Sequence, residues 1–138
     1  MVLYKLVVEY NGKNFFGSQK QSSLRTVEGI IEKVFNNLLN TKNSKVSFLS
    51  RTDRGVHSLG NIAKLFCDKK FDTKKFLEKT NYFLPEDVKI IKISKVYKKS
   101  NFRPKYKIYY YVVYNSHTSP TLLKEYSLWV KQKISIPV

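Results

Sequence analysis

The sequence is poor in acidic side chains. Its 138 residues include 26 lysines and arginines but only 10 aspartates and glutamates, which gives a formal net charge of +16. The imbalance is strongest after Val88, where eleven basic residues are accompanied by a single acid, Glu125. So few carboxylates predict a polyanionic partner, most simply a nucleic acid. The alternative is a lysine-rich protein with solvated charged faces, which explains the abundant lysine but not the scarce acids.

Cysteine is scarce, and long apolar runs are missing. The one cysteine, Cys67, lies within an apolar stretch, so no disulfide forms within the chain and a reducing compartment is expected. We expect this thiol to be a packing group rather than a nucleophile. No apolar run approaches the ~20 residues of a membrane-spanning helix, and the first residues lack a signal-peptide pattern. These absences predict a cytoplasmic protein.

Motifs for metals and cofactors are absent as well. With two histidines, one cysteine and no spaced cluster of ligands, a metal site is not expected. The sequence contains no Walker loop, no dinucleotide fingerprint and no Gly-x-Ser-x-Gly elbow.

What the sequence does contain is the apolar patterning of one α+β domain. Hydrophobic residues make up 42% of the chain, enough for a real core. Thr26 is a candidate N-cap for a helix over residues 27–39, and Asp72 is one for a second helix that ends before Pro85. The second helix is expected to point Phe76, Leu77, Thr80 and Phe83 inward. Strands are predicted over residues 3–10, 45–49, 61–67 and 88–96.

The resulting order, βαββαβ, predicts a ferredoxin-like fold with a four-stranded antiparallel sheet and both helices on one face. Residues 1–97 would form this N-terminal half. Residues 98–138 would contain a basic connector over 98–107, a long β-prone strand over 106–114 that extends the sheet, and the start of a truncated second half. Tyrosines occupy both faces of this strand.

The stretch SRTDRGVH, residues 50–57, interrupts two apolar runs with a polar loop. Aspartate is common in tight turns, where its side chain accepts backbone N–H groups, and on pattern alone this structural interpretation of Asp53 is favoured. Its neighbours Arg51 and Arg54 favour an ionised carboxylate, which can act as a nucleophile or a base. Because a carboxylate on a nucleic-acid surface repels phosphate, we interpret Asp53 as a reactive group.

Other residues fit an RNA surface. His57 is expected to hydrogen-bond within its loop or to contact phosphate. Rings of the tyrosine-rich strand pack in a core by default, but an exposed ring beside basic residues would stack on an unpaired base. RNA-recognition motifs display aromatic side chains on a similar sheet. Their glycine-aromatic signature is absent here, which argues against an ordinary RNA-recognition motif.

The loop SRTDRGVHSLGN resembles the catalytic loop of the TruA-type tRNA pseudouridine synthases, whose usual form is Gly-Arg-Thr-Asp-x-Gly-Val-His. Four further stretches match the same family in the same order: VVEYNGKNFFGSQKQ, TVEGIIEKVF, TNYFLPEDVKI and YYYVVYN. The resemblance covers nearly the whole chain. It implies that the chain is the N-terminal half of a two-lobed pseudouridine synthase fold.

This resemblance also implies roles for individual residues. Asp53 falls on the catalytic aspartate, Arg51 on the arginine that helps to extrude the target nucleotide, and Tyr109 on the ring that packs against the target base. The implied reaction converts uridine to pseudouridine in tRNA, in the anticodon stem-loop, without a cofactor, and homodimers are a family expectation. Arg54 lies at a variable position, so its role is electrostatic. The candidate RNA contacts are Arg54, His57, Arg103 and Lys107.

Three departures from the family pattern indicate a divergent member. Ser18 stands where tryptophan is usual, Leu49-Ser50 replaces a pair of small residues, and Asn101 lies where arginine is common. The family also carries a second ferredoxin-like half, so we expect this chain to be a fragment or a truncated product that is inactive alone. The alternative is a half that pairs with another chain. The alternative function is an RNA-binding module without catalysis. A small ribosome-associated protein would explain the charge but not the loop.

Overall fold

A computed structural model describes residues 1–97 and 102–137. The chain divides into two compact units, Met1–Pro104 and Lys105–Val138. The first unit contains, in order, β1 (Val2–Tyr10), the 3-10 turn η1 (Gly12–Asn14), α1 (Val27–Leu39), β2 (Lys45–Phe48), β3 (Ser58–Cys67), α2 (Thr73–Phe83) and β4 (Val88–Val96). The strands form one antiparallel sheet in the order β2-β3-β1-β4.

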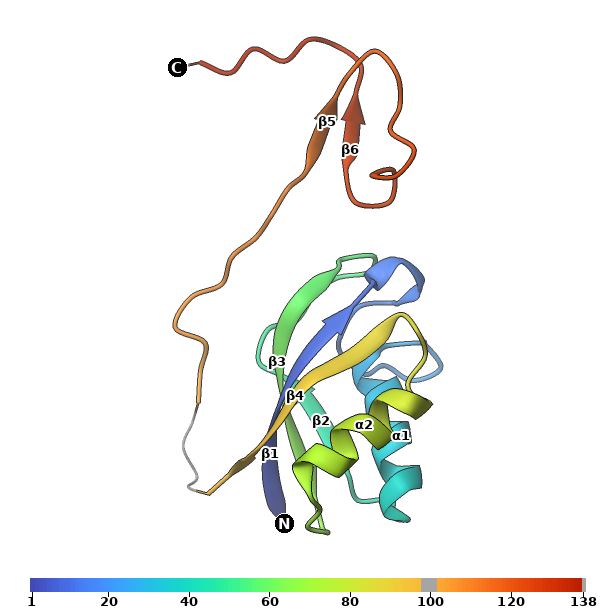
Figure 1. Ribbon diagram of the computed structural model, residues 1–138, viewed down its shortest axis with the longest axis vertical. Helices are drawn as coiled ribbons and strands as arrows, with labels where there is room; N and C mark the ends of the chain where they lie inside the picture. Colours follow the sequence, from blue (N-terminus) through green and yellow to red (C-terminus); the bar gives the residue numbers. More distant parts are fainter. Residues whose placement is uncertain (98–101, 138) are drawn as a thin grey trace. The chain divides into compact units, whose positions relative to one another are not determined.

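Figure 1 shows α1 and α2 on the same face of this sheet. The predicted α+β class and the order βαββαβ are therefore confirmed. The central strand β1 alternates as a strand with one covered face should, because Tyr4, Leu6 and Val8 are fully buried while their neighbours are not. Leu6 lies opposite Ala63 of β3 and Ile93 of β4. These side chains form the middle of the core.

Helix α1 begins and ends as the sequence predicts. The Thr26 hydroxyl accepts a hydrogen bond from the backbone N–H of Gly29 over 3.3 Å, which satisfies one of the free donors of the first turn. The buried stripe includes Ile31 and Phe35 at the helical spacing of four. The helix stops at Asn40, which adopts the left-handed conformation with φ 48°.

Helix α2 departs from the prediction at its last residue. The Asp72 carboxylate caps the helix by accepting from the backbone N–H of Lys75 over 2.9 Å, and Thr80 is fully buried. Phe83, however, is 55% exposed, so its predicted inward position is wrong. The backbone becomes extended at Leu84, as expected for a residue before proline. Leu84 thereby fills the core in place of Phe83, with 4% exposure.

The second unit contains β5 (Val113–Asn115) and β6 (Leu128–Val130), which pair in parallel as a small separate sheet. Within the described residues, only Val113 and Tyr114 of the predicted strand over residues 106–114 lie in a strand, β5, and the extension of the main sheet by this segment stays a prediction. The carbonyl of Val112 accepts the backbone N–H of Leu128 in β6 over 2.8 Å, whereas residues 106–111 belong to no strand in the described part of the chain. Aromatic and β-branched residues favour a strand only where a neighbouring backbone takes up the hydrogen bonds.

Of the helices that the structure describes, neither is long and apolar enough to span a lipid bilayer.

Candidate active site

Asp53 lies in the loop that joins β2 to β3. The loop turns sharply here, since the backbone N–H of Val56 donates to the carbonyl of Asp53 over 3.2 Å and Gly55 takes a φ of 80°. The side chain of Asp53 is exposed. Among the described residues, none donates a hydrogen bond to its carboxylate or forms an ion pair with it. The structural interpretation, in which Asp53 serves the amides of its own turn, is therefore not supported.

The carboxylate borders an open hollow of about 400 Å³. Arg51 and Arg54 line the same hollow, together with Phe16, Gln19 and Gln21 from the loop after η1. A single anionic group thus shares a concave surface with two cations, an aromatic ring and two amides. Such a surface can accept a phosphate, a base edge and a reacting group at once.

Thr52 fixes the backbone next to Asp53. Its hydroxyl lies 2.8 Å from the phenol oxygen of Tyr10 at the end of β1. The Asn61 side-chain amide of β3 donates to the same phenol oxygen over 3.1 Å and to the carbonyl of Ser50 over 2.8 Å. The loop is thereby tied to two strands of the sheet, and Asp53 is presented at a defined place rather than on a loose tip.

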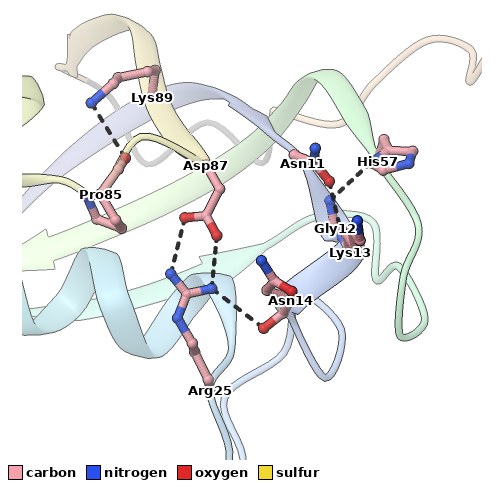
Figure 2. A network of polar contacts seen from close by, with 9 residues as sticks. All are labelled: Asn11, Gly12, Lys13, Asn14, Arg25, His57, Pro85, Asp87 and Lys89. Carbon is pink, nitrogen blue, oxygen red and sulfur yellow. Dashed lines mark hydrogen bonds and ion pairs between the residues drawn. The ribbon is translucent and has the colours of Figure 1, made fainter. Parts of the chain in front are cut away.

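A second loop, over residues 11–21, contacts the Asp53 loop and is called the supporting loop below. The backbone N–H of Gly12 donates to Nδ1 of His57 over 3.0 Å (Figure 2). The approach is so close that a Cβ on Gly12 would lie 2.0 Å from the carbonyl oxygen of Val56. The hydrogen bond of His57 to a neighbouring loop shows that this side chain joins the two loops.

Arg54 packs on an aromatic ring at the edge of the hollow. Its guanidinium carbon lies 4.4 Å from the ring centroid of Phe16, a cation–π contact, and the ring keeps 38% of its surface exposed. Sequence reasoning did not select Phe16 as a site residue. The sequence signal was an aromatic residue before Gly17, in a loop that the family resemblance already singled out.

An ion pair anchors the supporting loop to the start of β4. Both terminal nitrogens of Arg25 donate to the carboxylate of Asp87 over 2.9 Å, and one of them also reaches the carbonyl of Asn14 over 3.3 Å (Figure 2). The same guanidinium lies 4.0 Å from the ring centroid of Phe15. A bidentate pair of this kind fixes orientation as well as position. The sequence carried no periodic signal for it.

Three other predicted site residues come from later parts of the chain. Tyr109 and Lys107 belong to the second unit, where both are exposed, and Arg103 is exposed near the end of the first unit. Their roles therefore remain predictions. Asn101, one of the departures from the family pattern, lies outside the described residues. The structure brings together Asp53, Arg51, Arg54 and the His57 loop.

Two further groups can be placed. Cys67 is fully buried, its thiol donates to the carbonyl of Lys69 over 3.2 Å, and burial raises the pKa of that thiol, as expected for a packing residue. Within residues 1–97 and 102–137, no three histidine, cysteine, aspartate or glutamate side chains cluster in a way that would hold a metal ion.

Known proteins similar to this chain point to one family. The sequence profile of tRNA pseudouridine synthases matches residues 6–107. The chain is 38% identical over 141 residues to tRNA pseudouridine synthase A of Dictyoglomus turgidum, an alignment that covers 98% of this chain and 56% of that protein. It is 38% identical over 137 residues to tRNA pseudouridine synthase A of Aquifex aeolicus, with the same coverage of 98% and 56%.

A more distant relative, tRNA pseudouridine synthase A of Francisella tularensis subsp. novicida, is 32% identical over 96% of this chain and 52% of its own length. The chain thus spans about half the length of the curated relatives it matches. The profile match includes the Asp53 loop, the supporting loop, the strands β2, β3 and β4, and β1 from Leu6 onward. This chain therefore belongs to the tRNA pseudouridine synthase family.

Proposed function

We propose that the protein converts uridine to pseudouridine in tRNA, with Asp53 as the catalytic group. The observation that carries this proposal is the state of the carboxylate: it is exposed, it borders a hollow lined by Arg51 and Arg54, and no described residue occupies it with a hydrogen bond. A carboxylate that stabilised only its own turn would be engaged by backbone amides. This one is left available to a ligand.

The reaction places few demands on the site. The N-glycosidic bond of uridine breaks, the uracil turns, and its C5 becomes bonded to the ribose, so substrate and product are isomers and no oxidant or cofactor is consumed. An oriented carboxylate can act in such a reaction as a nucleophile or a base. Arg51 and Arg54 line the same hollow as Asp53, so two positive charges are available there to the phosphates of a bound RNA.

The proposed substrate must leave its base stack to reach Asp53. Unstacking costs a few kcal/mol, which phosphate contacts and aromatic stacking offset. Arg51 is proposed to help extrude the nucleotide, Arg54, His57, Arg103 and Lys107 to contact RNA, and Tyr109 to stack on the uracil. The formal charge of +16 supports binding to RNA. The anticodon stem-loop as target, a homodimeric assembly and a cytoplasmic location complete the proposal.

The decisive experiment replaces Asp53 with asparagine in the complete protein. Asp53→Asn removes the charge while keeping the shape, so we expect pseudouridine formation in unmodified tRNA to be abolished and tRNA affinity to change less than about threefold. Asp68→Asn is the matched control, because Asp68 is another surface carboxylate, held by Thr41 and Asn43 away from the hollow. Turnover retained in Asp53→Asn would refute the assignment.

A binding module without catalysis is the second candidate, favoured by the formal charge of +16, which supports RNA binding but does not require a reaction. Filter-binding and pseudouridine mapping on the same samples separate the two functions. RNA binding by wild type and Asp53→Asn alike, with no product from either, would identify the module.

A further inference from the structure

We propose that Ser18 is a positioning residue that holds Asp53 in place for catalysis, an inference that rests on the proposed function. Ser18 is a polar side chain with no exposed surface. Its hydroxyl oxygen accepts the backbone N–H of Thr52 over 2.9 Å, and its own backbone N–H donates to the carbonyl of Thr52 over 3.0 Å. One serine therefore satisfies both backbone polar groups of the residue before Asp53.

The second of these bonds acts directly on the reactive residue. The carbonyl of Thr52 belongs to the peptide unit that carries the nitrogen of Asp53, and a peptide unit is planar. Holding that oxygen fixes the plane from which the Asp53 side chain departs. Gly17 permits the approach: it has a φ of 87°, and a Cβ there would lie 2.8 Å from the same oxygen.

Ser18 is itself held by helix α1. Its carbonyl accepts the backbone N–H of Glu28 over 3.0 Å, in the first turn of the helix. The carboxylate of Glu28, which is only 6% exposed, accepts the backbone N–H of Lys20 over 2.7 Å and that of Phe48 over 2.8 Å. The first turn of α1 is thereby hydrogen-bonded to the supporting loop, at Ser18 and Lys20, and to β2, at Phe48. The position of Asp53 is set by α1 through Ser18.

Not every buried hydroxyl in this fold forms a hydrogen bond as the Ser18 hydroxyl does. Ser44 and Thr80 are equally buried, and neither hydroxyl has a hydrogen-bond partner among the described residues. Burial of a serine therefore does not require that it bind a backbone amide. The Ser18 hydroxyl, in contrast, accepts the backbone N–H of Thr52, the residue that precedes the proposed catalytic Asp53.

The experiment compares Ser18→Ala, Ser44→Ala and Val46→Ala. Ser44→Ala is the matched control, since it removes a buried hydroxyl that forms no hydrogen bond with any described residue. Val46→Ala deletes core atoms on β2 and serves as the reference for lost stability. Exchange of the Thr52 amide proton is measured by NMR on the 138-residue chain. The constants kcat and KM for tRNA are measured on the complete protein well below its melting temperature.

We expect Ser18→Ala to accelerate exchange of the Thr52 amide about tenfold or more, because its hydrogen bond is lost. The same variant should lower kcat about tenfold or more with KM changed less than about twofold, since small displacements of a reacting group act on the chemical step. Ser44→Ala should change neither quantity. Val46→Ala should lower the melting temperature without lowering kcat.

Unchanged Thr52 exchange in Ser18→Ala would overturn the proposal, and so would a fall in kcat that Val46→Ala reproduces. If wild-type protein forms no pseudouridine, the proposed function fails instead. The exchange measurement then still decides whether Ser18 holds the Asp53 loop.

Discussion

The backbone N–H of Gly12 donates to Nδ1 of His57 across 45 positions of sequence, and this bond of 3.0 Å joins the loop after β1 to the loop that carries Asp53 (Figure 2). The bond requires the imidazole nitrogen to be an acceptor, so Nδ1 carries no proton in this arrangement. It also requires the two backbones to approach more closely than a side chain would allow. Gly12 is therefore a contact residue of the site as well as a turn residue.

Adding one methyl group at Gly12 should disturb the site. The Cβ of Gly12→Ala would lie 2.0 Å from the carbonyl oxygen of Val56, so one loop must move and the bond to His57 must lengthen. We expect a loss of about 1–3 kcal/mol in the free energy of unfolding and reduced activity. Thermal denaturation followed by circular dichroism checks the first effect, and pseudouridine mapping checks the second.

Gly60→Ala is the control for that variant. A Cβ on Gly60 would meet nothing closer than Cγ1 of Val7 at 3.5 Å, an ordinary contact. Its melting temperature should equal or exceed that of wild type, because alanine is favoured over glycine in a strand. Equal effects of the two substitutions would show that the close approach at Gly12 is unimportant.

The contact between Phe16 and Arg54 should contribute to RNA affinity. The guanidinium carbon lies 4.4 Å from the centroid of a partly exposed ring that lines the hollow, which holds the charge where a phosphate or base would enter. Phe16→Ala and Arg54→Ala should each weaken tRNA binding about threefold to tenfold. In the double variant the losses should be less than additive, as measured by fluorescence anisotropy in a double-mutant cycle. Phe83→Ala, at an exposed ring on α2, should bind as wild type does.

The cap of α2 makes stability depend on pH. The hydrogen bond from the Lys75 amide lowers the pKa of Asp72 below the ordinary value of 3.8. A carboxyl with a depressed folded-state pKa stabilises the protein above its unfolded pKa, and this contribution is lost as the pH falls through the folded value. Asp72→Asn keeps a capping oxygen that does not titrate. Between about pH 4 and pH 2, urea denaturation should therefore show a smaller loss of stability for Asp72→Asn than for wild type.

The main sheet and its helices could be predicted because their signals are local. Ile31 and Phe35 of α1 follow the helical period, Leu6 and Val8 of β1 follow the strand period, and Thr26 and Asp72 mark helix starts. The strand over residues 106–114 could not be predicted in the same way. Its composition favours a strand, but composition does not supply a partner, and pairing decides whether a β-prone segment forms a sheet.

The cluster of Asp53 with two arginines at the candidate site was predictable, but the contacts that support it were not. Asp53, Arg51 and Arg54 lie within four consecutive residues, so the sequence alone shows that two arginines flank the carboxylate. The pair Arg25 and Asp87 is separated by 62 positions and leaves no periodic trace. Ser18 was interpreted as a departure from the family pattern, whereas the structure shows it buried and bonded to Thr52.

The bond between Arg25 and Asp87 sets a lower limit on how far the first unit can be shortened at its C-terminal end. The loop that carries Ser18 is fastened by a residue that the ribosome adds only after α2 is complete. A shortened version ending before Asp87 would retain Asp53, both arginines and His57, yet would lack this fastening. Grafts, split-protein halves and circular permutants of this domain should therefore keep Asp87 on the same polypeptide or supply it in trans.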